Sequence, residues 1–93
     1  MAKMPMELST FQFESGHELT DSNGEIEVTF TKPFPTNPTV VCTPIAQSGI
    51  QYLCVNKNVS TTGFKSVSKR ADSGTTSSAG NDVYWFAVTG YNN

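Results

Sequence analysis

The sequence predicts an all-β domain, and three observations support this. No stretch places apolar residues at helical spacing between a cap and a stop signal. Short runs rich in β-branched and aromatic residues alternate between apolar and polar side chains with a period of two. Turn-forming residues separate these runs. The chain has 93 residues, of which 37% are hydrophobic, so it has room for one core. We therefore expect a six-stranded antiparallel β-sandwich.

The first strand is expected from Leu8 to Ser15, where Phe11 and Phe13 share one face. Gly16 is expected to begin a polar loop. This loop ends in the turn Thr20–Gly24, because its Asn-Gly pair suits a backbone with positive φ. We interpret residues 1–7 as a linker or tag remnant, and residues 8–93 as the domain.

The second strand is expected from Glu25 to Thr31. It alternates as a half-buried strand does, and its inward residues are Ile26, Val28 and Phe30. The segment Lys32–Pro38 follows, and its prolines remove the donors that a sheet interior needs. It is expected to cross between the sheets, with Phe34 closing one end of the core.

The middle of the chain predicts three more strands, over 39–45, 50–59 and 64–69. The last of these has few apolar residues, which favours an edge position or a solvated face. Cys42 and Cys54 lie in the first two runs. Their spacing matches no metal or redox motif, so they are interpreted as free thiols, with one disulfide between neighbouring strands as the alternative.

The segment Arg70–Asn81 consists mostly of small polar residues and is expected to be a long mobile loop. Loops of this kind often carry recognition.

The final strand, Val83–Gly90, is apolar on both faces. One face can enter the sandwich, and the other needs a cover that a helix-free chain of this length cannot supply. We therefore expect a homo-oligomer, with an interface that draws on Tyr84, Trp85, Phe86 and Val88.

Composition excludes several classes of function. Six Lys and Arg stand against eight Asp and Glu, for a net charge of −2, so no nucleic acid partner is expected. No apolar run is long enough for membrane insertion. The one histidine, His17, is expected to be a solvated loop residue. No nucleophile with a base, phosphate loop or metal-ligand spacing is found, so no catalytic residue, metal or cofactor is expected.

Five short motifs occur in an order that resembles the H-type lectin domain. They are FESG at 13–16, VTFxxPF at 28–34, PTVV at 38–41, VSTTGFK at 59–65 and YWFAV at 84–88. The resemblance covers about residues 12–91. It implies a six-stranded antiparallel sandwich that assembles as a homotrimer, with sugar sites near the subunit boundaries.

The resemblance also implies which residues bind the sugar. The family uses a loop aspartate before the second strand, for which Asp21 stands with a two-residue shift. Gln51 occupies the position of the family's arginine, and Ala71 and Asp72 replace its Trp-His pair. Asp21, Gln51, Arg70 and Asp72 are therefore the residues expected to hydrogen-bond a glycan.

The polar, weakly charged composition is similar to that of the C-terminal receptor-binding heads of bacteriophage tail fibres. This version predicts a virion protein made in the host cytoplasm, at the tip of a tail fibre, that binds a cell-surface glycan. Two alternatives stay open. One is a structural module that trimerises or caps a virion fibre and has no ligand. The other is a cellular or extracellular H-type lectin that binds N-acetylgalactosamine-type sugars.

Overall fold

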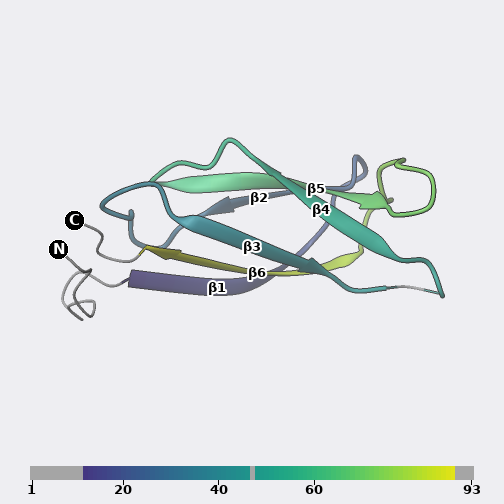
Figure 1. Ribbon diagram of the computed structural model, residues 1–93, viewed down its shortest axis with the longest axis horizontal. Coiled ribbons are helices and arrows are strands. Elements are labelled where there is room, and N and C mark those ends of the chain that lie inside the picture. The colour runs from purple at the N-terminus through teal and green to yellow at the C-terminus, as the bar shows by residue number, and fades with distance from the viewer. Residues whose placement is uncertain (1–11, 47, 90–93) are drawn as a thin grey trace, which may run out of the picture.

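The computed structural model describes residues 12–46 and 48–89. Two three-stranded antiparallel sheets lie face to face (Figure 1). The first sheet has the order β1-β6-β3, and the second has the order β2-β5-β4. The strands are β1 (Gln12–Leu19), β2 (Glu25–Thr29), β3 (Thr39–Pro44), β4 (Tyr52–Lys57), β5 (Gly63–Arg70) and β6 (Asp82–Thr89). The prediction of six antiparallel strands is confirmed, whereas the remnant expected over 1–7 lies outside the described residues.

The core lies between the sheets and is built around aromatic rings. Trp85 of β6 meets Phe64 of β5 edge to face, with ring centroids 5.5 Å apart. Phe34 packs edge to face on Phe30 at 4.7 Å, and its backbone N–H donates to Thr61 O. The predicted position of Phe34 at the end of the core is confirmed. The buried apolar residues are Ile26, Val28, Phe30, Phe34, Phe64, Val83, Trp85 and Ala87.

The first strand differs from the prediction, because it continues through Gly16 as far as Leu19. Gly16 pairs with Trp85 of β6, and a Cβ at Gly16 would lie 2.8 Å from the indole ring. Because Gly16 has no side chain, the Trp85 ring can lie directly against its backbone and cover it. The expectation of a loop from Gly16 was wrong, because it treated a glycine that serves packing as a strand end. Residues 8–11 of the expected strand lie outside the described residues.

Of the two positions predicted for the fifth strand, the edge position was wrong, whereas its outward face does carry Lys65 and Lys69. β5 is the central strand of its sheet and pairs with both β2 and β4. Its inward side chains Phe64, Ser66 and Ser68 are all buried. The hydroxyl of Ser66 donates to Val55 O at 3.3 Å and to Asn56 Oδ1 at 2.9 Å. Serines can occupy a central strand because they are small, and at Ser66 the neighbouring strand also accepts the hydroxyl proton.

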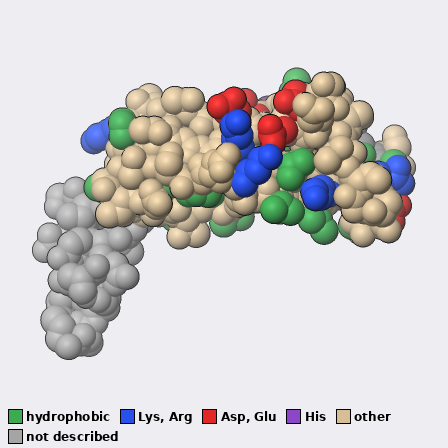
Figure 2. Space-filling view, turned by 90° about the horizontal axis from the view of Figure 1, so that it is seen from above, with side chains coloured by type: hydrophobic (Ala, Val, Ile, Leu, Met, Phe, Trp, Pro, Cys, Tyr) green, Lys and Arg blue, Asp and Glu red, His purple; other side chains and the backbone are tan. Residues whose placement is uncertain are grey.

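The two outer faces of the sandwich differ. Lys and Glu side chains gather over the middle of the β2-β5-β4 sheet, beside an apolar group (Figure 2). The register places Glu27, Lys65 and Lys57 in one row of this face. The outer face of the β1-β6-β3 sheet instead exposes large apolar side chains, namely Phe13, Leu19, Val41, Tyr84 and Phe86. No helix within 12–46 and 48–89 is long and apolar enough to span a membrane.

Candidate functional site

Three loops meet at one end of the sandwich, opposite the end where β1 begins and β6 ends (Figure 1). They connect β1 to β2, β3 to β4, and β5 to β6. All four residues predicted to bind a glycan lie in these loops or at their borders. The sandwich therefore supplies a rigid base, and the loops at this end form the candidate site.

The loop between β5 and β6 is held by hydrogen bonds along much of its length. Ser77 is buried, and its N–H donates to Ser68 O at 2.8 Å. The hydroxyl of Thr20, in the neighbouring loop, donates to Ser78 O at 2.6 Å and accepts from the N–H of Asn81 at 3.0 Å. The Thr20 bonds connect the β5–β6 loop to the β1–β2 loop. The sequence had predicted that this segment would be mobile.

Gln51 and Asp72 lie at the same pocket. The Ala71 N–H donates to Gln51 O at 2.9 Å, which brings the start of β4 against the end of β5. The pocket has a volume of about 350 Å³ and opens to solvent. Its lining residues are Gly49, Ile50, Gln51, Ala71 and Asp72. Residues from two loops thus form one hollow, and Gln51 and Asp72 are among the residues that line it.

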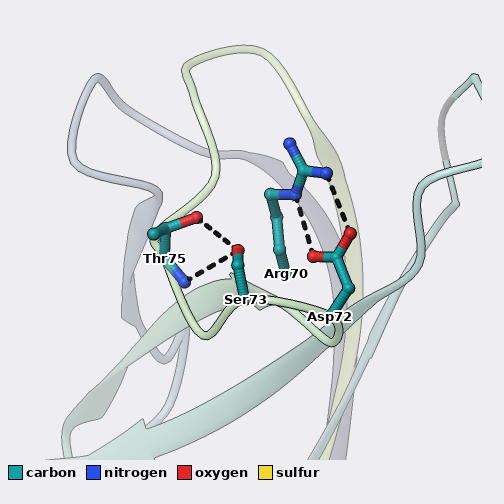
Figure 3. A network of polar contacts seen from close by, with 4 residues as sticks. All are labelled: Arg70, Asp72, Ser73 and Thr75. Carbon is teal, nitrogen blue, oxygen red and sulfur yellow. Dashed lines mark hydrogen bonds and ion pairs between the residues drawn. The ribbon is translucent and has the colours of Figure 1, made fainter.

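Arg70 borders this pocket through an ion pair with Asp72 (Figure 3). Its Nε donates to Asp72 Oδ1 at 3.1 Å and its Nη2 to Oδ2 at 2.9 Å. These hydrogen bonds are the main reason why the pKa of Asp72 lies below its ordinary value. The same pair raises the pKa of Arg70. Asp72 is thus held ionised and oriented at the edge of the pocket, although both side chains are open to solvent.

Asp21 is not among the residues that line this pocket. Its Oδ1 accepts from the N–H of Asn23 at 2.8 Å and from the N–H of Glu25 at 3.0 Å. The Gly24 N–H donates to Asp21 O, and Gly24 has a φ of 73°. Asp21 therefore stabilises the turn that precedes β2. This role is typical of an aspartate at the start of an Asp-Ser-Asn-Gly turn.

An aromatic residue that the sequence prediction did not name lies next to Gln51 in the chain and opposite Arg70 in the sheet. Tyr52 is half-buried and pairs with Arg70 in the register of β4 and β5. Its position directly after Gln51 was the signal available in the sequence. Together Gln51, Arg70 and Asp72 offer an amide, a guanidinium and a carboxylate. This set can both donate to and accept from hydroxyl groups.

The four residues predicted for the oligomer interface lie on two different faces. Trp85 points into the core, where it is 5% exposed. Tyr84 and Phe86 are 51% and 40% exposed on the outer face, and Val88 is half-buried on the same side. Only three of the four can therefore meet a partner on this face.

His17 lies in β1 on this outer face, so the expected loop position was wrong, although the side chain is exposed as expected. Its ring stacks on Tyr84 with centroids 4.5 Å apart, and its Nε2 lies 2.7 Å from Asp82 Oδ1. Sequence reasoning missed this pair because its two members lie far apart in the chain. Across the described ranges, no three His, Cys, Asp or Glu side chains are grouped so as to hold a metal ion.

Comparisons with known proteins indicate the fold. No family model matches the sequence, and no curated protein matches it. The fold is similar to part of the crystal structure of the Pseudomonas phage phi297 tailspike gp61, with a TM-score of 0.52 and 20% sequence identity. The similar region covers 84% of this chain, which spans 15% of the length of that tailspike chain. At this identity the likeness shows a shared β fold.

Proposed function

We propose that this chain is a non-catalytic receptor-binding domain of a phage tail fibre, with an H-type lectin-like fold, that binds glycans of the bacterial surface. The observation that carries the proposal is the pocket where Gln51, Asp72 and the paired Arg70 meet at one end of the sandwich. The similarity to part of a phage tailspike supports the virion context. The protein would then be located at the tip of the fibre.

The chemistry of the pocket suits a sugar. A pyranose ring presents neighbouring hydroxyls that need both donors and acceptors, and the Gln51 amide supplies both. The Asp72 carboxylate accepts from hydroxyls, while the Arg70 guanidinium keeps free N–H donors beyond the two that it gives to Asp72. The pocket volume of about 350 Å³ is within the range of small-molecule sites. A site that is this open to solvent binds a sugar weakly, so several copies are needed on one surface.

A homotrimer would supply these copies. The outer face of the β1-β6-β3 sheet exposes Phe13, Tyr84 and Phe86, and its His17 and Asp82 pair with each other. Burial of this face between subunits removes a large apolar area from water. Three sites on one assembly add avidity of about 10² to 10⁴ without any new contact.

The test is binding of the full-length protein to a panel of bacterial surface polysaccharides, with N-acetylgalactosamine-type sugars included. Gln51→Ala and Asp72→Asn should each weaken binding by about 10-fold or more, because each removes hydrogen bonds to the ligand. Glu27→Gln is the matched control, since Glu27 borders a second polar pocket at the opposite end of the sandwich. Undiminished binding by both site variants would falsify the site. Inhibition by N-acetylgalactosamine alone would favour the cellular lectin alternative.

A structural module without a ligand is the second candidate, and the exposed apolar face of the β1-β6-β3 sheet favours it. Such a module needs only the interface. The Gln51→Ala, Asp72→Asn double variant distinguishes the two, since it leaves this face intact. A receptor-binding domain loses adsorption to host cells while its oligomer persists. A structural module keeps both the oligomer and the infectivity of virions that carry the variant.

A further inference from the structure

The two cysteines face each other between the sheets, on the side where β3 and β4 pack together. Cys42 and Cys54 both occupy inward positions and pack against the core. Their thiols hydrogen-bond to each other, and both contact the hydroxyl of Ser66. Asn56 Nδ2 donates to Val40 O at 2.9 Å, which holds the same two strands together one pair of inward residues further along. Both thiols are free and half-buried.

The contact makes the two thiols chemically unequal. The hydrogen bond from Cys42 lowers the pKa of Cys54 to about 7. The same bond, together with burial, raises the pKa of Cys42. The lowered pKa favours the thiolate of Cys54, which is the nucleophilic form. A second thiol lies in hydrogen-bonding contact with it. An attacking thiolate beside a resolving thiol is the arrangement that disulfide exchange needs.

We propose that Cys42 and Cys54 are a redox-active pair that forms a disulfide between the sheets by exchange with a small-molecule disulfide. The Cys54 thiolate attacks one sulfur of oxidised glutathione, which forms a mixed disulfide and releases one glutathione thiolate. The Cys42 sulfur then attacks the Cys54 sulfur and displaces the second glutathione. The Cys42 proton passes to a departing thiolate. The protein is oxidised by two electrons, and glutathione disulfide is reduced to two thiols.

The position of this bond relates it to the candidate site. Cys42 and Cys54 lie in the two strands that flank the β3–β4 loop, and this loop carries Gln51. The disulfide closes the base of the loop and reduces its freedom, so the pocket is better organised before ligand arrives. This consequence rests on the proposed function, whereas the formation of the bond does not. A virion protein leaves the reducing cytoplasm at lysis, so the bond would form at the stage when binding is needed.

The first experiment exposes the full chain to oxidised glutathione at pH 7 and measures free thiols and intact mass. We expect both thiols to be lost, a mass lower by two hydrogens, and no retained glutathione. The Tm should rise by roughly 10 °C, as a short covalent loop predicts. In the Cys42→Ser control, Cys54 should keep one glutathione and the Tm should not rise. Two free thiols in the wild type, alongside a glutathionylated control, would overturn the proposal, and so would a bond between chains.

A second experiment tests the order of the steps. Brief treatment of the reduced protein with iodoacetamide should label Cys54 before Cys42, and the rate should rise as the pH passes through 7. Equal labelling of both cysteines would contradict the assigned roles. Glycan affinity of the oxidised and reduced forms is then measured separately, and we expect a several-fold gain on oxidation. If the disulfide forms and no glycan binds, the proposed function fails while the redox pair stands.

Discussion

β5 and β6 are both central strands, yet they differ in the residues that they place on their inward and outward faces. β6 places Val83, Trp85 and Ala87 in the core and still exposes Tyr84 and Phe86 on its outer face. β5 buries two serines along with Phe64 on the inside, and carries Lys65 and Lys69 on the outside. The two strands differ in composition although each is hydrogen-bonded on both sides.

This difference shows what the apolar content of a strand indicates about its surroundings in a small sandwich. A central strand does not need apolar side chains if its small hydroxyl groups find acceptors, as Ser66 does at Asn56. Apolar residues on an outward face, in contrast, indicate a surface that gains from being covered. The composition of a strand thus indicates what its two faces contact. Its position in the sheet, in contrast, is given by its hydrogen-bonded neighbours.

Trp85→Ala tests the inward face of β6. Trp85 contacts Phe30 and Phe64 and covers Gly16, so its loss should lower the free energy of unfolding by about 3–5 kcal/mol. Chemical denaturation measures the effect. Tyr84→Ala on the neighbouring outward position is the control and should cost the isolated subunit far less. A Trp85→Ala protein as stable as the wild type would mean that β6 does not carry the core.

Phe86→Lys tests the outward face of β6. If this face is buried between subunits, an unpaired ammonium group there should weaken assembly by about 3 kcal/mol or more, over a hundredfold in the dissociation constant. Val55→Lys is the matched control on the β2-β5-β4 sheet, since Val55 and Phe86 are 45% and 40% exposed. Light scattering should detect subunits from Phe86→Lys and trimers from Val55→Lys. A monomeric wild type at micromolar concentration would refute the trimer itself.

Ser66→Ala and Ser68→Ala test the inward face of β5. Ser66 donates hydrogen bonds to β4, so its alanine variant should be less stable by about 1 kcal/mol. Ser68 Oγ is buried and has no partner within the described residues, so Ser68→Ala should leave stability unchanged or slightly raise it. Thermal unfolding of the two variants provides the comparison. Equal losses of stability in the two variants would show that the small size of serine, and not its hydrogen bonding, allows it to occupy this strand.

Lys57→Ala tests the outward face of the β2-β5-β4 sheet and should have the smallest effect. Lys57 forms an ion pair with Glu25 across β5, but its side chain is 48% exposed. We expect a loss of about 0.5 kcal/mol or less, and a smaller one at high salt, because solvent screens the pair. Denaturation at two ionic strengths measures it. A loss above about 1 kcal/mol would show that this charged face is also structural.

The sequence predicted the strands correctly where the pattern depends only on residues that are neighbours in the chain. Alternation located the inward residues of β2, and the prolines after it located the crossing that buries Phe34. It failed at Gly16 and at β5, where the deciding partner is distant in the chain. The Trp85 ring that covers Gly16 and the β4 acceptors that satisfy Ser66 cannot be read from the neighbouring residues.

The candidate site shows the same division. The amino-acid pattern was enough to predict an all-β chain with low charge, long polar loops and an apolar last strand. Only the tertiary structure decided that Gln51 and Asp72 share a pocket, that Asp21 holds a turn, and that Cys42 meets Cys54. The physical reason is that strand periodicity depends on neighbouring residues, whereas a pocket depends on which loops the register of two sheets brings to one end.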